Sequence, residues 1–379
     1  MRYFYWYLYL LLWLFAFIAP NVSDKAQKRL LAWYCAIWTI VFGFRRYDVG
    51  NDTPGYAAYF ENVGLGQKYG TVDNPDETLE SGFLFFSQVV NSFTDSATIV
   101  FLLIGVGVWY GLYLLYKWQS SIPLLSFLLM MTVTGKMFYT LGIAVRQAVS
   151  IVVILFGIIY IIKSRIDSWR YIFKNKLAIW GVLLCLASIT IHRTTGAMAM
   201  ILVLLYFLRL SKNMAYFLIV TFTIIAIWAA PMIGQMFDAA LMVVGAFSDE
   251  KVNLLGDRYM GDMTNYGYSG GAMIAWTVPA LLTTYLSNKK EVNSFFFKTY
   301  IFSLCLHQLI QFSTMHIRLT PLFILLGFIC AVPAICVNNR FWYNVYLLIG
   351  LFYLYLDYKM FTQWDVAMDE AVPYYFIWE

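Results

Sequence analysis

A small set of charged and imidazole side chains lies within or beside the apolar segments of this chain, and these are the residues that could do chemistry. The set comprises Lys136, Arg146, His192, Arg193, His307, His316 and Arg318, with a cluster of Arg45, Arg46, Asp48 and Asp52. Arginine holds phosphate through two parallel hydrogen bonds, and imidazole or carboxylate groups can accept a proton. The set favours an anionic substrate, such as a lipid pyrophosphate, but also fits an anion transporter.

Each of these residues also has a structural explanation. Lys136 and Arg193 could extend along apolar surface to place their charges in water. A histidine at a helix end, such as His192, could be structural. The stretch 51–55, Asn-Asp-Thr-Pro-Gly, has the composition of a plain turn. These alternatives remain open at the level of residue type.

The composition of the chain places most of these residues in a membrane. Hydrophobic residues make up 61% of the 379 residues and charged residues 12%, and the mean hydropathy is +0.68. A soluble domain has about 25% charged residues, and each crossing of a bilayer needs about 20 mostly apolar residues. We therefore expect an all-α, polytopic membrane helix bundle forming one domain over 1–379, with the lipid bilayer and not nucleic acid as its partner.

Apolar runs predict about twelve transmembrane helices. Their expected ranges are 3–20, 29–44, 96–116, 122–140, 142–162, 177–191, 195–210, 214–235, 270–287, 297–313, 319–337 and 341–357. The segment 81–92 is apolar but too short to span, so we expect it to lie along the interface or re-enter.

The distribution of charge predicts the orientation of these helices. The loops after odd-numbered helices, counted with the helix ends that adjoin them, carry 15 of the 26 basic residues but 3 of the 21 acidic residues. The positive-inside rule places these loops in the cytoplasm, so both termini and the long loops 45–95 and 236–269 lie outside. Arg46, Arg146 and His192 then share one outer depth with Arg318, which predicts a single polar cavity opening outward.

Common cofactor and metal motifs are absent from the sequence. It contains no P-loop, no Rossmann glycine pattern and no H-E-x-x-H. Its five cysteines lie in apolar segments without metal-type spacing. We expect neither a cofactor nor a metal site.

Several short motifs resemble a known family in the same order along the chain. The stretch 46–56, RYDVGNDTPGY, resembles the R…G-x-D-x-x-x-Y loop of EpsG-like proteins, which group with Wzy-type polymerases of O-antigen, capsule and exopolysaccharide. The segment 80–83, ESGF, resembles the family's E-x-G-[FY], and Arg146, His192 and Arg318 resemble its later arginines and histidine. Ala148-Val149 replaces the usual Leu-Ala, and Arg193 stands where a small residue is common.

The resemblance implies a glycosyltransferase-type polymerase that needs no metal. Its substrate would be an oligosaccharide repeat on undecaprenyl pyrophosphate, delivered by a flippase to the periplasmic face of the bacterial inner membrane, with a chain-length regulator as a further partner. The expected catalytic residues are Asp52, His192 and Arg146, and the expected substrate-binding residues are Arg46, Tyr56, Glu80, Arg193 and Arg318.

Two alternatives come from other classes of protein. One is a transporter or flippase of a lipid-linked or anionic solute, for which substrate sites near the membrane midplane are expected. The other is a different polytopic glycosyltransferase or an acyltransferase, for which His307 is the deep histidine.

Overall fold

The computed structural model describes residues 4–50, 52–62, 79–134, 137, 139–245, 270–310, 319–363 and 375–378. The described residues are helical apart from turns, connections and one isolated antiparallel bridge between Arg45 and Phe376. The predicted all-α class is therefore confirmed for this part of the chain.

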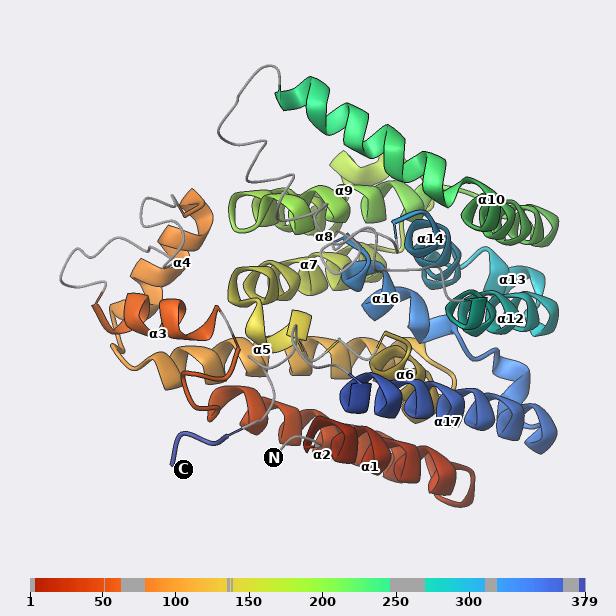
Figure 1. The fold of residues 1–379 in the computed structure, drawn as a ribbon, viewed down its shortest axis with the longest axis horizontal. Helices are drawn as coiled ribbons and strands as arrows, with labels where there is room; N and C mark the ends of the chain where they lie inside the picture. The colour runs from red at the N-terminus through yellow and green to blue at the C-terminus, as the bar shows by residue number, and fades with distance from the viewer. Residues whose placement is uncertain are drawn as a thin grey trace. The chain divides into compact units, whose positions relative to one another are not determined.

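Most of the helices in Figure 1 lie within the predicted apolar ranges, with two clear differences. The helices are α1 Phe4–Ile18, α2 Asp24–Gly43, α3 Thr53–Asn62, α4 Ser81–Asn91, α5 Ala97–Gln119, α6 Pro123–Thr132, α7 Val145–Ser164, α8 Lys176–Ala187, α9 Arg193–Phe207, α10 Lys212–Gly245, α12 Gly270–Leu286, α13 Lys289–Val292, α14 Phe295–Ile310, α16 Pro321–Gly327 and α17 Arg340–Gln363. The predicted span 122–140 is wrong in length, because α6 ends at Thr132, and the predicted span 214–235 is too short, because α10 continues to Gly245 in the region expected as a loop.

Some described helices are long enough to cross a bilayer and others are shorter. By length and composition, Phe4–Asn21, Ala97–Gln119 and Val145–Ser164 qualify among the described residues, and further apolar helices have 10–17 residues. These features support a helical membrane protein, and the number of twelve spans stays a prediction. The predicted span 319–337 is divided into α16 and two 3₁₀ segments, because Pro333 lacks the backbone donor that a continuing helix needs.

The chain forms two compact units, each described by itself. The first comprises Met1–Leu208 with Cys336–Glu379, and the second comprises Arg209–Ile335. The expectation of one domain over 1–379 stays a prediction. All the described candidate residues except His307 belong to the first unit.

In the first unit, α7 lies between α5 and α8 and contacts both (Figure 1). Helices α1, α6 and α17 contact one another, and α2 packs along α5. An aromatic core joins α2 to α5, where the Trp38 and Trp109 rings stack with their centroids 5.4 Å apart. This packing holds α7, whose first turn carries Arg146, in the interior of the unit.

The region 45–95, predicted as a long loop, contains two short helices. Helix α3 begins at Thr53 with Pro54 in its first turn, a favoured position because that residue's missing N–H has no partner to lose there. Helix α4 covers the segment that we expected at the interface, and its 11 residues are too short to span. The Asn91 side chain donates to the Phe60 carbonyl at 2.8 Å, which joins α4 to α3.

The second unit contains a polar contact between apolar helices. The Gln308 amide on α14 donates to the hydroxyls of Thr223 on α10 and Thr277 on α12, each at 2.9 Å. Such bonds are common between membrane helices. His307, the acyltransferase candidate, is buried here with its ring stacked on Trp276 at 4.2 Å.

Candidate functional site

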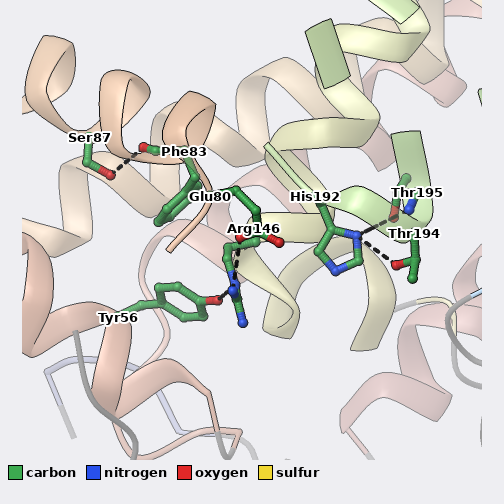
Figure 2. Close-up of polar contacts among 8 residues, drawn as sticks. All are labelled: Tyr56, Glu80, Phe83, Ser87, Arg146, His192, Thr194 and Thr195. Carbon is green, nitrogen blue, oxygen red and sulfur yellow. Dashed lines mark hydrogen bonds and ion pairs between the residues drawn. The ribbon is translucent and has the colours of Figure 1, made fainter. Parts of the chain in front are cut away.

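Arg146 is the centre of the polar cluster in the first unit. It is the second residue of α7, and its Nη1 atom lies 3.0 Å from Oε2 of Glu80. Its Nε atom donates to the Tyr56 hydroxyl at 2.6 Å. Figure 2 shows Tyr56 and Glu80 both directed at the guanidinium group. Tyr56 and Glu80, which come from separate motifs, therefore both bind the charged group of Arg146.

The charges of this cluster are only partly in contact with solvent. The Arg146 side chain is 20% exposed and that of Glu80 is 14% exposed, and Tyr56 is buried. Electrostatic interactions in such surroundings are stronger than at an open surface. Tyr56 accepts the bond from Arg146, so its own hydroxyl proton is directed at a different group.

Aromatic packing between α3 and α4 places Tyr56 and Glu80. The Phe83 ring on α4 contacts Tyr56, Tyr59 and Phe60 on α3, with centroids 5.8, 6.4 and 6.1 Å away. Glu80 directly precedes α4, three residues before Phe83. The same hydrophobic contact therefore brings both partners of Arg146 to one place.

Gly50 attaches the preceding loop to the segment before Arg146. Its φ of +91° lies in the region where L-residues are strained. A Cβ atom there would come within 2.5 Å of the Ile143 side chain. Ile143 ends the π-helical turn Tyr139–Ile143, directly before α7. Only glycine tolerates both the positive φ and the close approach of the Ile143 side chain, and this explains why the loop motif has glycine at position 50.

Helix α4 also packs against the turn that precedes His192. A Cβ atom on Gly82 would lie 2.9 Å from the backbone C and O atoms of Thr190. Thr190 ends the 3₁₀ segment Ser188–Thr190, and His192 follows as the N-cap of α9. The close approach at Gly82 therefore brings this turn to the start of α4, two residues from Glu80.

The His192 ring caps α9 through Nδ1. This atom accepts from the backbone N–H of Thr195 at 3.3 Å and lies 2.7 and 3.2 Å from the hydroxyls of Thr195 and Thr194 (Figure 2). An N–H group can only donate, so the neutral ring carries its proton on Nε2. In this tautomer His192 presents a hydrogen-bond donor at Nε2, which suits a donor to the substrate better than a base.

Asp52 and Arg46 lie on the loop before α3. The half-buried Asp52 directly precedes the helix, and its carbonyl accepts from the Tyr56 amide at 3.1 Å. The exposed Arg46 guanidinium donates to both carboxylate oxygens of Asp48, at 2.7 and 2.5 Å, and these bonds lower the pKa of Asp48. The Arg46 guanidinium also lies 4.3 Å from the ring centroid of Tyr375.

The remaining candidates are distributed differently. Arg193 is exposed as the first residue of α9. Lys136, His316 and Arg318 lie outside the described residues. Tyr56, Glu80 and Arg146 are thus in direct contact, and the turn before His192 packs beside them.

Asp357 is a buried acidic residue that the sequence analysis did not select. It is 3% exposed on α17, where the predicted span ended at 357 but the helix continues to Gln363. In the sequence, the carboxyl group of Asp357 followed by Lys359 is typical of a helix end. The predicted span 341–357 already included Asp357 as the last residue, and no pattern in the sequence indicated that it would be buried.

The helices and the cluster define a helical membrane protein with a charged site at the start of an apolar helix. The family model of the EpsG family matches residues 28–376, and the chain belongs to this family. Family membership confirms the resemblance and indicates a polysaccharide polymerase in general terms. No match was found among curated proteins or among solved structures.

Proposed function

We propose that the protein joins oligosaccharide repeats carried on undecaprenyl pyrophosphate, at the periplasmic face of the bacterial inner membrane, to make O-antigen or a related surface polysaccharide. The bond between the donor sugar and its pyrophosphate breaks, and a bond forms to a hydroxyl at the non-reducing end of the acceptor repeat. Undecaprenyl pyrophosphate leaves, and the hydroxyl proton passes to a base. The reaction uses no metal.

The contact of Arg146 with Glu80 and Tyr56 carries this proposal. Arg146 lies in the first turn of a 20-residue helix, where backbone N–H groups and the helix dipole favour an anion. A pyrophosphate leaving group gains charge as the glycosidic bond lengthens, and a preorganised cation stabilises that charge. Arg146 is therefore the principal pyrophosphate ligand, assisted by Arg46 and Arg318.

Glu80 orients the Arg146 guanidinium while no substrate is bound. A guanidinium has five N–H donors in a fixed planar fork, so it can keep a carboxylate contact along one edge and bind phosphate with another. Tyr56 fixes the Nε edge. Glu80 and Tyr56 also supply oxygens for sugar hydroxyls, and the region 45–80, with three basic and seven acidic residues, suits sugar better than phosphate.

The base in this proposal is Asp52, with His192 as the alternative. A base must lie within hydrogen-bond reach of the acceptor hydroxyl. Asp52 directly precedes α3, one turn from Tyr56. His192 accepts at Nδ1 from the α9 backbone, so it serves more readily as a donor to the substrate through Nε2. Arg193, the next residue in the chain, contributes a positive charge.

The proposed orientation follows from the charge of the loops, and the proposed partners follow from the resemblance to the family. Basic loops on the cytoplasmic side place the long loops and the site in the periplasm. A flippase then supplies the lipid-linked repeat, and a chain-length regulator acts on the same product.

Deletion of the gene, followed by complementation, tests this function. If the protein is a polymerase, the deletion strain loses the polysaccharide ladder and retains single-repeat species. An Arg146→Ala protein at normal abundance then fails to restore the ladder. Lys163→Ala is the matched control, because it removes an exposed charge from the other end of α7. Loss of all repeats would indicate a flippase or an earlier enzyme, and normal polymerisation by R146A would exclude the pyrophosphate role.

A further inference from the structure

Arg45, at the end of α2 and directly before Arg46, is buried with 2% of its surface exposed. A buried guanidinium is unfavourable unless its donors are satisfied. Its Nη1 atom donates to the Phe42 carbonyl at 2.9 Å, and its Nε atom donates to the Thr53 hydroxyl at 3.3 Å. The guanidinium also lies 4.4 Å from the ring centroid of Phe101. Arg45 thus joins α2, α5 and the first residue of α3.

The contact with Thr53 determines how α3 is rotated. Thr53 and Tyr56 are three residues apart, so they lie on the same face of the helix. Both are buried. Holding the Thr53 hydroxyl against Arg45 therefore turns the Tyr56 side chain toward Arg146, whose Nε atom is 2.6 Å from the Tyr56 hydroxyl.

Arg45 also lies beside the segment that leads into Arg146. It lines a small cavity of about 10 Å³ together with Leu141, Gly142 and Val145 of that segment. A space of this size is about that of one water molecule. Arg45 thus lies between the helix that carries Tyr56 and the segment that leads into Arg146.

The neighbouring Arg46 is bound in a different way. Its side chain is 38% exposed, and it pairs with Asp48 across the surface of the loop. Consecutive arginines in the sequence therefore have separate surroundings, one inside the protein and one at its surface. The buried Arg45 is in direct contact with α3, the helix that carries Tyr56.

We infer that Arg45 is a positioning residue: it holds α3 at the rotation that places the Tyr56 hydroxyl on Arg146 and so fixes the guanidinium of Arg146 for its anionic substrate. The consequence for catalysis rests on the proposed function, whereas the geometric statement does not. Loss of the Arg45–Thr53 contact lets α3 rotate, and the bond between Tyr56 and Arg146 weakens while the fold persists.

The geometric part is tested by ¹⁹F NMR of the full chain in nanodiscs, with 3-fluorotyrosine placed at position 56. Arg146→Gln gives the reference signal for a lost bond. Arg45→Met and the nearly isosteric Thr53→Val should move the signal toward that reference, and Thr53→Ser, which keeps the hydroxyl, should leave it in place. Arg46→Met should not move the signal, because that side chain lies on the loop surface.

The catalytic part is tested with purified protein and lipid-linked repeats. Arg45→Lys and T53V should lower kcat about tenfold with KM within about twofold of the wild type, because Arg146 acts chiefly on the charge that develops on the departing pyrophosphate, whereas the other contacts still bind substrate. Unmoved ¹⁹F signals in R45M and T53V would overturn the inference whatever the activity. If the ¹⁹F signals move in the variants but the wild-type protein does not polymerise lipid-linked repeats, the positioning role is upheld and the proposed function is rejected.

Discussion

The Nε atom of Arg146 lies 2.6 Å from the hydroxyl oxygen of Tyr56, a residue 90 positions earlier in the chain. This bond joins the loop motif that follows α2 to the first turn of α7. Because Glu80 binds the same guanidinium through Nη1, the orientation of the arginine is defined along two of its edges.

Tyr56→Phe removes one oxygen atom and keeps the aromatic packing against Phe83. A hydrogen bond to a charged group contributes about 1.5–3 kcal/mol, and 1.4 kcal/mol corresponds to a tenfold change in rate. We expect polymer formation to fall about tenfold or more at unchanged abundance in the membrane. The measurement is the initial rate of polymer formation from lipid-linked repeats, and a rate equal to the wild type would contradict a role for this bond.

Glu80→Gln removes the carboxylate and leaves the charge of Arg146 half-buried. We expect E80Q to lower the melting temperature, and the double variant E80Q/R146Q to lower it by less than the sum of the two single variants. The coupling energy should be about 1 kcal/mol, at the upper end for a pair that is partly exposed. Thermal unfolding of the four proteins in one detergent measures it, and strictly additive effects would show that the pair contributes nothing.

The sequence alone predicted the main helices and the residues of this cluster, but not their contacts. Apolar runs of about 20 residues are sufficient to locate α5 and α7, and the motif resemblance selected Tyr56, Glu80 and Arg146. The pairing of Glu80 with Arg146 was not predictable, because it depends on packing between α3 and α4 around Phe83. Helix α3 was itself missed, since Thr53-Pro54-Gly55 reads equally as a turn.

The role of Arg45 was hidden for a related reason. Two consecutive arginines after an apolar helix look alike in sequence, and the motif resemblance selected Arg46. Their difference arises from the path of the backbone, which directs one side chain toward Thr53 and Phe101 and the other toward Asp48. Tertiary contacts of this kind leave no local pattern in the sequence.

Gly50→Ala should destabilise the loop that carries Asp52. Alanine is strained at a φ of +91°, and its Cβ atom would overlap the Ile143 side chain. Strained backbone positions cost about 1–3 kcal/mol each, and the melting temperature should fall accordingly. Adding Ile143→Ala should recover only the part of the lost stability that comes from the steric overlap, because the backbone strain at position 50 remains. A G50A protein as stable and active as the wild type would mean that the loop has another conformation.

Asp48→Asn should change how stability depends on pH. Hydrogen bonds from Arg46 hold the pKa of Asp48 below its ordinary value of 3.8. A carboxyl group with a depressed pKa in the folded state contributes stability above its unfolded pKa, and the contribution disappears as the pH falls through the folded pKa. The side chain is 58% exposed, so the effect is below about 1 kcal/mol.

The wild type should therefore melt slightly higher than D48N at about pH 6, and the difference should disappear as the pH falls through the lowered pKa of Asp48 in the folded state. Thermal melts at several pH values measure the difference. A difference that persists unchanged in acid would assign the effect of the substitution to something other than this ion pair.

Removal of the C-terminal residues 375–379 should release Arg46. The Arg46 amide donates to the Tyr375 carbonyl at 2.9 Å, and the Ile377 amide donates to the Phe44 carbonyl at 2.8 Å. The Arg46 guanidinium lies against the Tyr375 ring, and the Trp378 ring contacts that of Phe44 with centroids 5.8 Å apart. Without these contacts, we expect trypsin to cleave after Arg46 severalfold faster than in the full chain.

The same cleavage also tests the proposed orientation. In spheroplasts, whose outer membrane is opened and whose inner membrane is intact, trypsin reaches Arg46 only if the loop faces the periplasm. Tyr375→Phe, which keeps the ring and the backbone bonds, is the matched control and should be cleaved as slowly as the wild type. Cleavage that requires disruption of the inner membrane would reverse the orientation, because Arg46 would then face the cytoplasm, and it would place the start of α7 on the wrong side for a periplasmic polymerase.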